Sequence, residues 1–370
     1  MLLLLPLPRL LPFFHDDWAV AAGSVLRPST LAAIAAWIAL AALAIHLRGG
    51  RAALAGLGVL FFLLAHALES TLLPLELVFE HRSYLPSLGV VLALACLGSL
   101  LPLAARLRVV LALLPLPVLA FATFVRASDW ADARDFALRS FELNPDSPRA
   151  ASQLAATLVA DGEPAAAVAV LQDIHHPGAR LQTLYIVCTA GREAAIPLHQ
   201  GLPPGDGLRM DGYATTAAIN LSDALHARHC ALPTLSFADW LATVVDRGHF
   251  VHQGEREKLS VHVAHALRDA DRHEEAMRWA ETRVPGSVRA LGRLLAADWR
   301  SEHGDCAKAL ENLDAAARLS PPVVGRGWAS MLADTQNLLA ERGCRPAPGA
   351  GTLKMGNAAA DSVGGWRQDP

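Results

Sequence analysis

The sequence predicts an all-α protein in which multi-spanning transmembrane helices are followed by a helical-repeat (α-solenoid) domain. Residues 1–125 are almost entirely apolar, whereas residues 126–344 have the composition of a soluble helical protein. The whole chain is 53% hydrophobic and only 18% charged, compared with about 25% charged residues in typical soluble domains. The shift in composition near Arg126 therefore marks the predicted boundary between a membrane domain and a repeat domain.

Four segments approach the about 20 apolar residues that a helix needs to cross a bilayer. The predicted spans are residues 30–47, 52–68, 85–103 and 109–125. Core helices of a large soluble protein are the alternative, but four such runs in succession are typical of membrane proteins. Residues 1–14 are interrupted by prolines and an arginine, which favours a short interfacial segment over a cleavable signal peptide.

Basic residues in the short loops predict the orientation of these spans. Arg48 and Arg51 separate the first two, and Arg106 and Arg108 separate the last two. Both loops are expected on the cytoplasmic side because short cytoplasmic loops are enriched in lysine and arginine. The repeat domain then lies on the opposite side of the membrane.

Small residues recur in the second part of the chain with the period of tetratricopeptide repeats. Ala133 and Ala167 are 34 residues apart, and Gly162 precedes Ala167 by five residues. The predicted TPR-like hairpins are anchored near Ala133, Ala167, Ala276 and Ala309. Such solenoids present a groove for a protein partner; a cap that only packs against the membrane part is the alternative.

Other segments of this part carry weaker signals. Residues 180–260 read as helical but degenerate, and the glycines and prolines of residues 201–212 predict a loop. Residues 345–370 lack an apolar period and are predicted to be a disordered tail.

Cysteine and histidine positions leave several alternatives open. Four cysteines of the repeat domain could form one or two disulfides in an oxidising compartment, with no pairing preferred: Cys188, Cys230, Cys306 and Cys344. Cys96 lies in an apolar run and is expected to be inert. Six histidines form three HxxH spacings: His226, His229, His249, His252, His262 and His265. No convincing ligand set completes them, so solvated or core histidines are expected and no metal site is predicted.

The net charge of −3 and the lack of a basic run argue against nucleic acid as a partner. The lipid bilayer is the partner that the first part of the chain predicts most directly.

Ionisable residues interrupt the apolar sequence in the segment LESTLLPLELVFEHRSYLP, residues 68–86. They are Glu69, Glu76, Glu80, His81 and Arg82. A charged group inside the bilayer costs roughly 2.5–3.5 kcal/mol on insertion scales, so this cluster indicates either a polar functional site or an internal ion network. The planar guanidinium of Arg82 is suited to grip a phosphate, and His81 could donate to the same oxygens or transfer a proton.

The stretch ESTLLPLELVFEHRSYLPSLG, together with FFHDDW upstream, resembles bacterial multi-spanning membrane proteins with C-terminal tetratricopeptide repeats. These are similar to the protein O-mannosyltransferase-like TMTC group of the GT-C glycosyltransferase superfamily. The positions that match their shared segment are Glu80, His81, Arg82, Tyr84, Leu85, Pro86, Ser87 and Gly89. The resemblance covers roughly residues 10–175.

This resemblance implies sugar transfer from a polyprenyl-phosphate carrier to a protein outside the cytoplasm. The residues expected near the carrier phosphate are Glu69, Glu80, His81, Arg82 and Tyr84. His15, Asp16 and Asp17 form an outer-loop acidic pair that could bind a divalent cation or substrate. The implied location is the bacterial inner membrane, with a multi-pass anchor and a periplasmic repeat domain.

One departure from the family limits the activity that can be expected. GT-C enzymes carry an acidic catalytic motif in their first external loop, and this sequence contains no counterpart, since His15, Asp16 and Asp17 match a later segment. The chain is therefore expected to be the C-terminal portion of such an enzyme and inactive alone. The alternative is a non-enzymatic, membrane-anchored TPR scaffold that binds a periplasmic protein.

Overall fold

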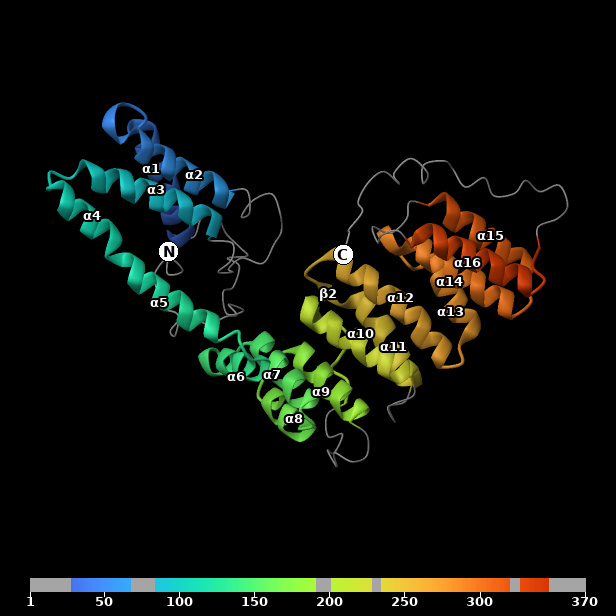
Figure 1. The fold of residues 1–370 in the computed structure, drawn as a ribbon. Helices are drawn as coiled ribbons and strands as arrows, with labels where there is room; N and C mark the ends of the chain where they lie inside the picture. The colour runs from blue at the N-terminus through green and yellow to red at the C-terminus, as the bar shows by residue number, and fades with distance from the viewer. Residues whose placement is uncertain (1–27, 68–83, 191–200, 228–233, 320–326, 346–370) are drawn as a thin grey trace, which may run out of the picture. The chain divides into compact units, whose positions relative to one another are not determined.

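The computed structural model describes residues 28–67, 84–190, 201–227, 234–319 and 327–345 (Figure 1). Within these ranges the protein is all-α, apart from two strands of two residues each. The chain divides into two compact units, Met1–Val170 and Leu171–Pro370. The all-α prediction is therefore confirmed for the part of the chain that the structure describes.

The described residues in the apolar part of the first unit, 28–67 and 84–128, form five α-helices and one 3₁₀ turn. They are α1 (Pro28–His46), η2 (Gly50–Ala52), α2 (Ala53–Ala67), α3 (Tyr84–Leu100), α4 (Ala105–Leu113) and α5 (Pro115–Ser128). Among the described residues, two helical stretches are long and apolar enough to cross a membrane, Pro28–His46 and Ala105–Ser128. The spans predicted at 52–68 and 85–103 correspond to the shorter α2 and α3, of 15 and 17 described residues. Of the four predicted spans, two therefore have the length of a crossing helix.

Helix α4 continues directly into α5 despite the prolines at positions 115 and 117. Leu114 keeps helical dihedral angles, and its amide donates to the carbonyl of Val110 at 2.8 Å. Pro115 and Pro117 occupy the first turn of α5, where a missing amide hydrogen costs little. No residue of α4 or α5 is buried, although most are apolar. Such an uncovered apolar surface is typical of a helix in lipid.

The remaining helices follow one another along the chain, and most of them contact the next one. They are α6 (Ala133–Leu143), α7 (Pro148–Ala160), α8 (Pro164–Gln172), α9 (Pro177–Thr189), α10 (Gly212–His226), α11 (Thr234–Arg247), α12 (Gln253–Asp269), α13 (His273–Thr282), α14 (Arg289–Glu302), α15 (Cys306–Arg318) and α16 (Trp328–Glu341), with the 3₁₀ turn η6 (Gly286–Val288) before α14.

Three turns between these helices share one backbone geometry. Gly162, Asp271 and Gly304 have positive φ angles of 81°, 60° and 76°. In each turn the next amide donates to a carbonyl five residues earlier, which satisfies the end of the preceding helix. An alanine five residues after each turn residue is fully buried: Ala167, Ala276 and Ala309. The first predicted anchor differs, because Ala133 is the exposed first residue of α6 and Ala137 is the buried position.

A small parallel sheet includes part of residues 201–212, the segment that the sequence predicts to be a loop. Strand β1 (Arg209–Met210) pairs with β2 (His249–Phe250), with Arg209 opposite His249. The segment before β1 is held by the indole nitrogen of Trp240, which donates to the carbonyl of Pro203 at 2.6 Å. This sheet joins segments about forty residues apart, so a local turn pattern could not predict it.

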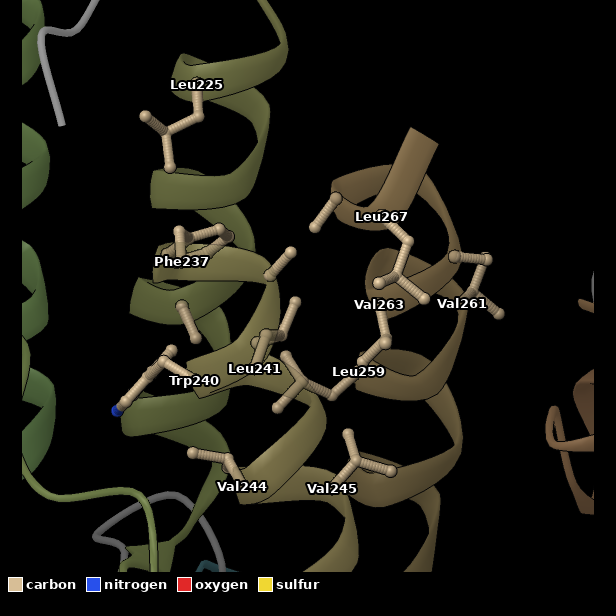
Figure 2. Close-up of a cluster of buried hydrophobic side chains, with 14 of the residues drawn as sticks. Leu225, Phe237, Trp240, Leu241, Val244, Val245, Leu259, Val261, Val263 and Leu267 are labelled. Carbon is tan, nitrogen blue, oxygen red and sulfur yellow. The ribbon is translucent and has the colours of Figure 1, made fainter. Parts of the chain in front are cut away.

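The largest core of the second unit lies between α9 and α14. Figure 2 shows Leu241 of α11 and Leu259 of α12 pointing toward one another, and both are fully buried. Trp299 of α14 is the largest fully buried side chain and belongs to the same cluster. The continuous core explains why the hairpins are stable together, since each one alone exposes an apolar face.

A second cluster holds the last three helices of the described chain together. It includes Leu294 of α14, Leu313 of α15 and Leu339 of α16. Arg342 donates to the side chains of Asp298 and Ser301, both at 2.7 Å. A disulfide between Cys306 and Cys344 closes the same group of helices, with Cα atoms 4.9 Å apart. Cys188 is also disulfide-bonded, and Cys96 is a buried thiol.

Candidate functional site

Most of the predicted site residues lie outside the part of the chain that the structure describes. These are His15, Asp16, Asp17, Glu69, Glu80, His81 and Arg82. Tyr84 is described: it is the first residue of α3, and 69% of it is exposed. Of the residues expected near the carrier phosphate, the structure therefore describes Tyr84. It also describes the two helices on either side of residues 68–83.

Those flanking helices, α2 and α3, contact each other backbone to backbone. A Cβ atom placed on Gly58 would lie 2.5 Å from the carbonyl oxygen of Gly89, and one placed on Gly89 would lie 2.4 Å from that of Gly58. Ala55 and Ala93 are buried in the same interface. Small residues permit this close approach, as in helix pairs inside membranes. The α2–α3 contact thus holds the two helices between which the ionisable segment is inserted.

The downstream half of the segment that carries the family resemblance has a structural explanation. Pro86 and Gly89 are buried in the first two turns of α3. The hydroxyl of Ser87 donates to the carbonyl of Tyr84 at 2.6 Å, a bond within the first turn of the helix. Packing of α3 therefore accounts for two of the matching residues, Pro86 and Gly89.

Replacing Gly89 with leucine is expected to destabilise the α2–α3 pair by about 1–3 kcal/mol, the usual cost of overpacking. The added side chain would meet the backbone of Gly58 and Phe62, and these atoms can move only if the helices separate. The melting temperature of the purified full chain in detergent measures this effect.

Gly98 provides a matched control for that substitution. It lies on the same helix, but a Cβ atom there would have no neighbour within 4 Å. Gly98→Leu should melt at the temperature of the unchanged chain. Equal melting temperatures for the Gly89 and Gly98 variants would show that the α2–α3 contact contributes nothing measurable.

Three histidines of the HxxH spacings come together in the second unit. His226 ends α10, and His262 and His265 lie one turn apart on α12. The ring centroid of His265 lies 6.1 Å from that of His226 and 6.5 Å from that of His262. Its ring also forms a T-shaped contact with Trp299 of α14, with the ring centroids 5.3 Å apart. We call these three side chains the histidine cluster.

Carboxylates contact the two outer members of the histidine cluster. Nδ1 of His226 lies 2.9 Å from both carboxylate oxygens of Asp269. Nδ1 of His262 lies 3.6 Å from Asp223. Asp269 also lines a small recess with neighbouring residues of α10, α11 and α12. The cluster therefore joins charged surface groups to the buried core at Trp299.

The histidine cluster does not form a metal centre in the described structure. Across residues 28–67, 84–190, 201–227, 234–319 and 327–345, no group of three His, Cys, Asp or Glu side chains is placed to hold a metal ion. His249 lies in β2 and His252 precedes α12, and His229 lies outside the described residues.

A second polar group, which the sequence did not indicate, connects α9 and α10. Nδ1 of His176 accepts from the amide of Gly178 at 3.0 Å, so Nε2 carries the proton and donates to Asp211 at 2.9 Å. Asp211 also accepts from the amide of Ala214 and begins α10. Burial raises the pKa of Asp211, but the hydrogen bonds from His176 and Ala214 outweigh it and lower the pKa below its ordinary value.

In these contacts two helix caps are joined by one hydrogen bond, from His176 to Asp211. Both ring nitrogens of His176 are engaged, which leaves neither one available to accept a proton from a substrate. Tyr213 stacks on the His176 ring with centroids 5.3 Å apart and donates to Gln182 at 2.6 Å. The group is best explained as a structural connection between the helices.

Comparisons of this chain with family models, with curated proteins and with solved structures find no match.

Proposed function

We propose that the protein is a membrane-anchored helical-repeat scaffold whose TPR-like hairpins bind a protein partner outside the cytoplasm. The observation that carries this proposal is the recurring turn at Gly162, Asp271 and Gly304, each followed by a buried alanine. Repeated hairpins with a shared core are an architecture that generally presents an extended binding surface. Two apolar helices of crossing length supply the anchor.

Cysteine chemistry supports a location outside the cytoplasm. The second unit contains the Cys306–Cys344 disulfide, and Cys188 is disulfide-bonded as well. Structural disulfides persist mainly in exported proteins because the cytoplasm keeps thiols reduced. This agrees with the orientation that Arg48, Arg51, Arg106 and Arg108 predict for a multi-pass protein of a bacterial inner membrane.

A second candidate function is a GT-C-like glycosyltransferase portion that binds a polyprenyl-phosphate-linked sugar. It is favoured by the glycine contact between α2 and α3, which holds the helices on either side of Glu69, Glu80, His81 and Arg82. In this proposal Arg82 binds the carrier phosphate, and the chain requires a further catalytic segment to transfer the sugar.

Site-specific photo-crosslinking in intact cells distinguishes the two functions. A photoreactive residue at Val251 or Met331, both exposed in the second unit, should yield an adduct with one defined protein if the repeats are a scaffold. The same group at Phe121 of α5, which is 68% exposed, should yield lipid adducts as the matched control. Lipid adducts at Phe121 without any protein adduct at the other two positions would contradict the scaffold.

The glycosyltransferase candidate is tested with a photoreactive polyprenyl phosphate added to membranes. Labelling of the chain should disappear in Arg82→Ala and persist in Arg48→Ala. The second variant removes an arginine from a loop predicted on the other side of the membrane. Equal labelling of the two variants would remove Arg82 from the proposed site.

A further inference from the structure

The histidine cluster combines a partly buried imidazole with a surface that water and protons can reach. His265 is partly buried and forms a T-shaped contact with the buried Trp299, while the side chain of His226 is 63% exposed and that of His262 is 23% exposed. A change of charge at His265 would therefore alter the contacts between α10, α12 and α14.

The charged and titratable groups around His265 come from all three of these helices. From α10 they are Asp223 and His226; from α12 they are His262, Arg268 and Asp269; from α14 there is Glu302. Arg268 is paired with Glu302 at 2.7 Å and lies over the Trp299 ring at 5.1 Å. Asp269 is engaged by His226. The carboxylates near His265 thus already have cationic or imidazole partners.

We propose that the histidine cluster makes the contact between three helices of the repeat domain sensitive to acid. Protonation of His265, which lies between His226, His262 and Arg268, separates α12 locally from α10 and α14. At neutral pH the uncharged ring packs on Trp299, and α12 stays in contact with α10 and α14. In mild acid the charged ring is repelled by its cationic neighbours and requires more hydration than its partly buried position against Trp299 provides.

The direction of the pH effect follows from the environment of the ring. Burial, then the neighbouring His262 and His226, and finally Arg268 lower the pKa of His265, while Asp269 opposes them. Burial also lowers the pKa of His262, against the attraction of Asp223. The unfolded chain therefore takes up these protons before the folded one. Stability is complete above the ordinary histidine pKa of about 6.5 and is lost as the pH falls from there toward the lowered value.

One interaction changes in the opposite direction. The contact between His226 and Asp269 becomes an ion pair when His226 is protonated. Because the His226 side chain is largely exposed, solvent screens this attraction, and such surface pairs contribute little to stability. The loss at His265 is therefore expected to dominate.

Amide hydrogen exchange of the full chain in detergent tests whether acid separates these helices. Protection, corrected for intrinsic exchange rates, is compared at about pH 7.5 and about pH 5.5, on either side of the ordinary histidine pKa. We expect protection of α10, α12 and α14 to fall several-fold in acid while α6 and α7 remain unchanged. His265→Phe, which keeps an aromatic edge on Trp299 but cannot be protonated, should remove most of this fall.

Control variants complete the experiment. His175→Gln removes an exposed histidine of the same unit outside the cluster and should retain the full pH response. If His265→Phe does not fold at neutral pH, His262→Gln removes one neighbouring imidazole and should reduce the response. No loss of protection in the unchanged chain would overturn the proposal, as would a full loss in whichever cluster variant folds.

Discussion

Replacing Arg300 with methionine is expected to lower the free energy of unfolding of the second unit by about 3–5 kcal/mol, the usual cost of breaking a buried ion pair. Arg300 is 3% exposed and donates to Glu281 at 2.9 Å and to Glu274 at 2.8 Å. Its hydrogen bonds connect α14 to α13. Without the guanidinium, the largely buried carboxylate of Glu281 keeps only Asn312 as a neutral donor.

Chemical denaturation of the full chain in detergent measures this loss. The double variant Arg300→Met with Glu281→Met should recover much of the stability, because replacing both partners leaves no uncompensated charge. Arg318→Met removes an arginine that pairs with Asp314 on the surface of α15, and it should change little. A single Arg300 variant as stable as the Arg318 variant would show that the buried pair contributes nothing to folding.

Replacing Cys306 and Cys344 with serine is expected to cost about 4 kcal/mol, because the disulfide closes a loop of 38 residues and so restricts the unfolded chain. The same bond holds the end of α16 to the start of α15. Unfolding should therefore begin in α14, α15 and α16, where Leu294, Leu313 and Leu339 form their own cluster.

Serine variants isolate this bond better than a reductant does, since Cys188 is also disulfide-bonded and would be reduced as well. Cys96→Ser is the control: this buried thiol lies on α3 in the first unit, so the denaturation of the second unit should not change. A double variant with unaltered stability would indicate that the closure of this loop is not what holds α16 in place.

The helical nature of the protein and its division into apolar and polar parts could be read directly from the sequence. Runs such as Thr30–Leu47 are too apolar for a solvated helix, and composition depends on no distant contact. The spacing from Gly162 to Ala167, repeated from Gly304 to Ala309, likewise predicted the hairpins, because a helix–turn–helix unit is a local structure. Asp271 was not foreseen as the equivalent turn residue, since aspartate adopts positive φ less readily than glycine.

Local patterns could not indicate which distant side chains would meet. The pairing of Cys306 with Cys344, the contact of Gly58 with Gly89, and the small sheet all depend on how helices pack. Helix lengths also differed from the apolar runs, so that two of four predicted spans, within the described residues, reach crossing length. The carrier-phosphate residues remain a prediction from the sequence.

The helical character of the chain and the contrast between its apolar and polar parts follow from neighbouring residues, so the sequence alone predicts them. The chemical environment of individual groups depends on the packing of distant residues and is seen only in the folded structure. His262 and His265 look like any exposed HxxH pair in the sequence, yet packing against Trp299 and His226 partly buries the imidazole of His265. Burial and electrostatic fields arise from groups brought together across space, and no local pattern contains them.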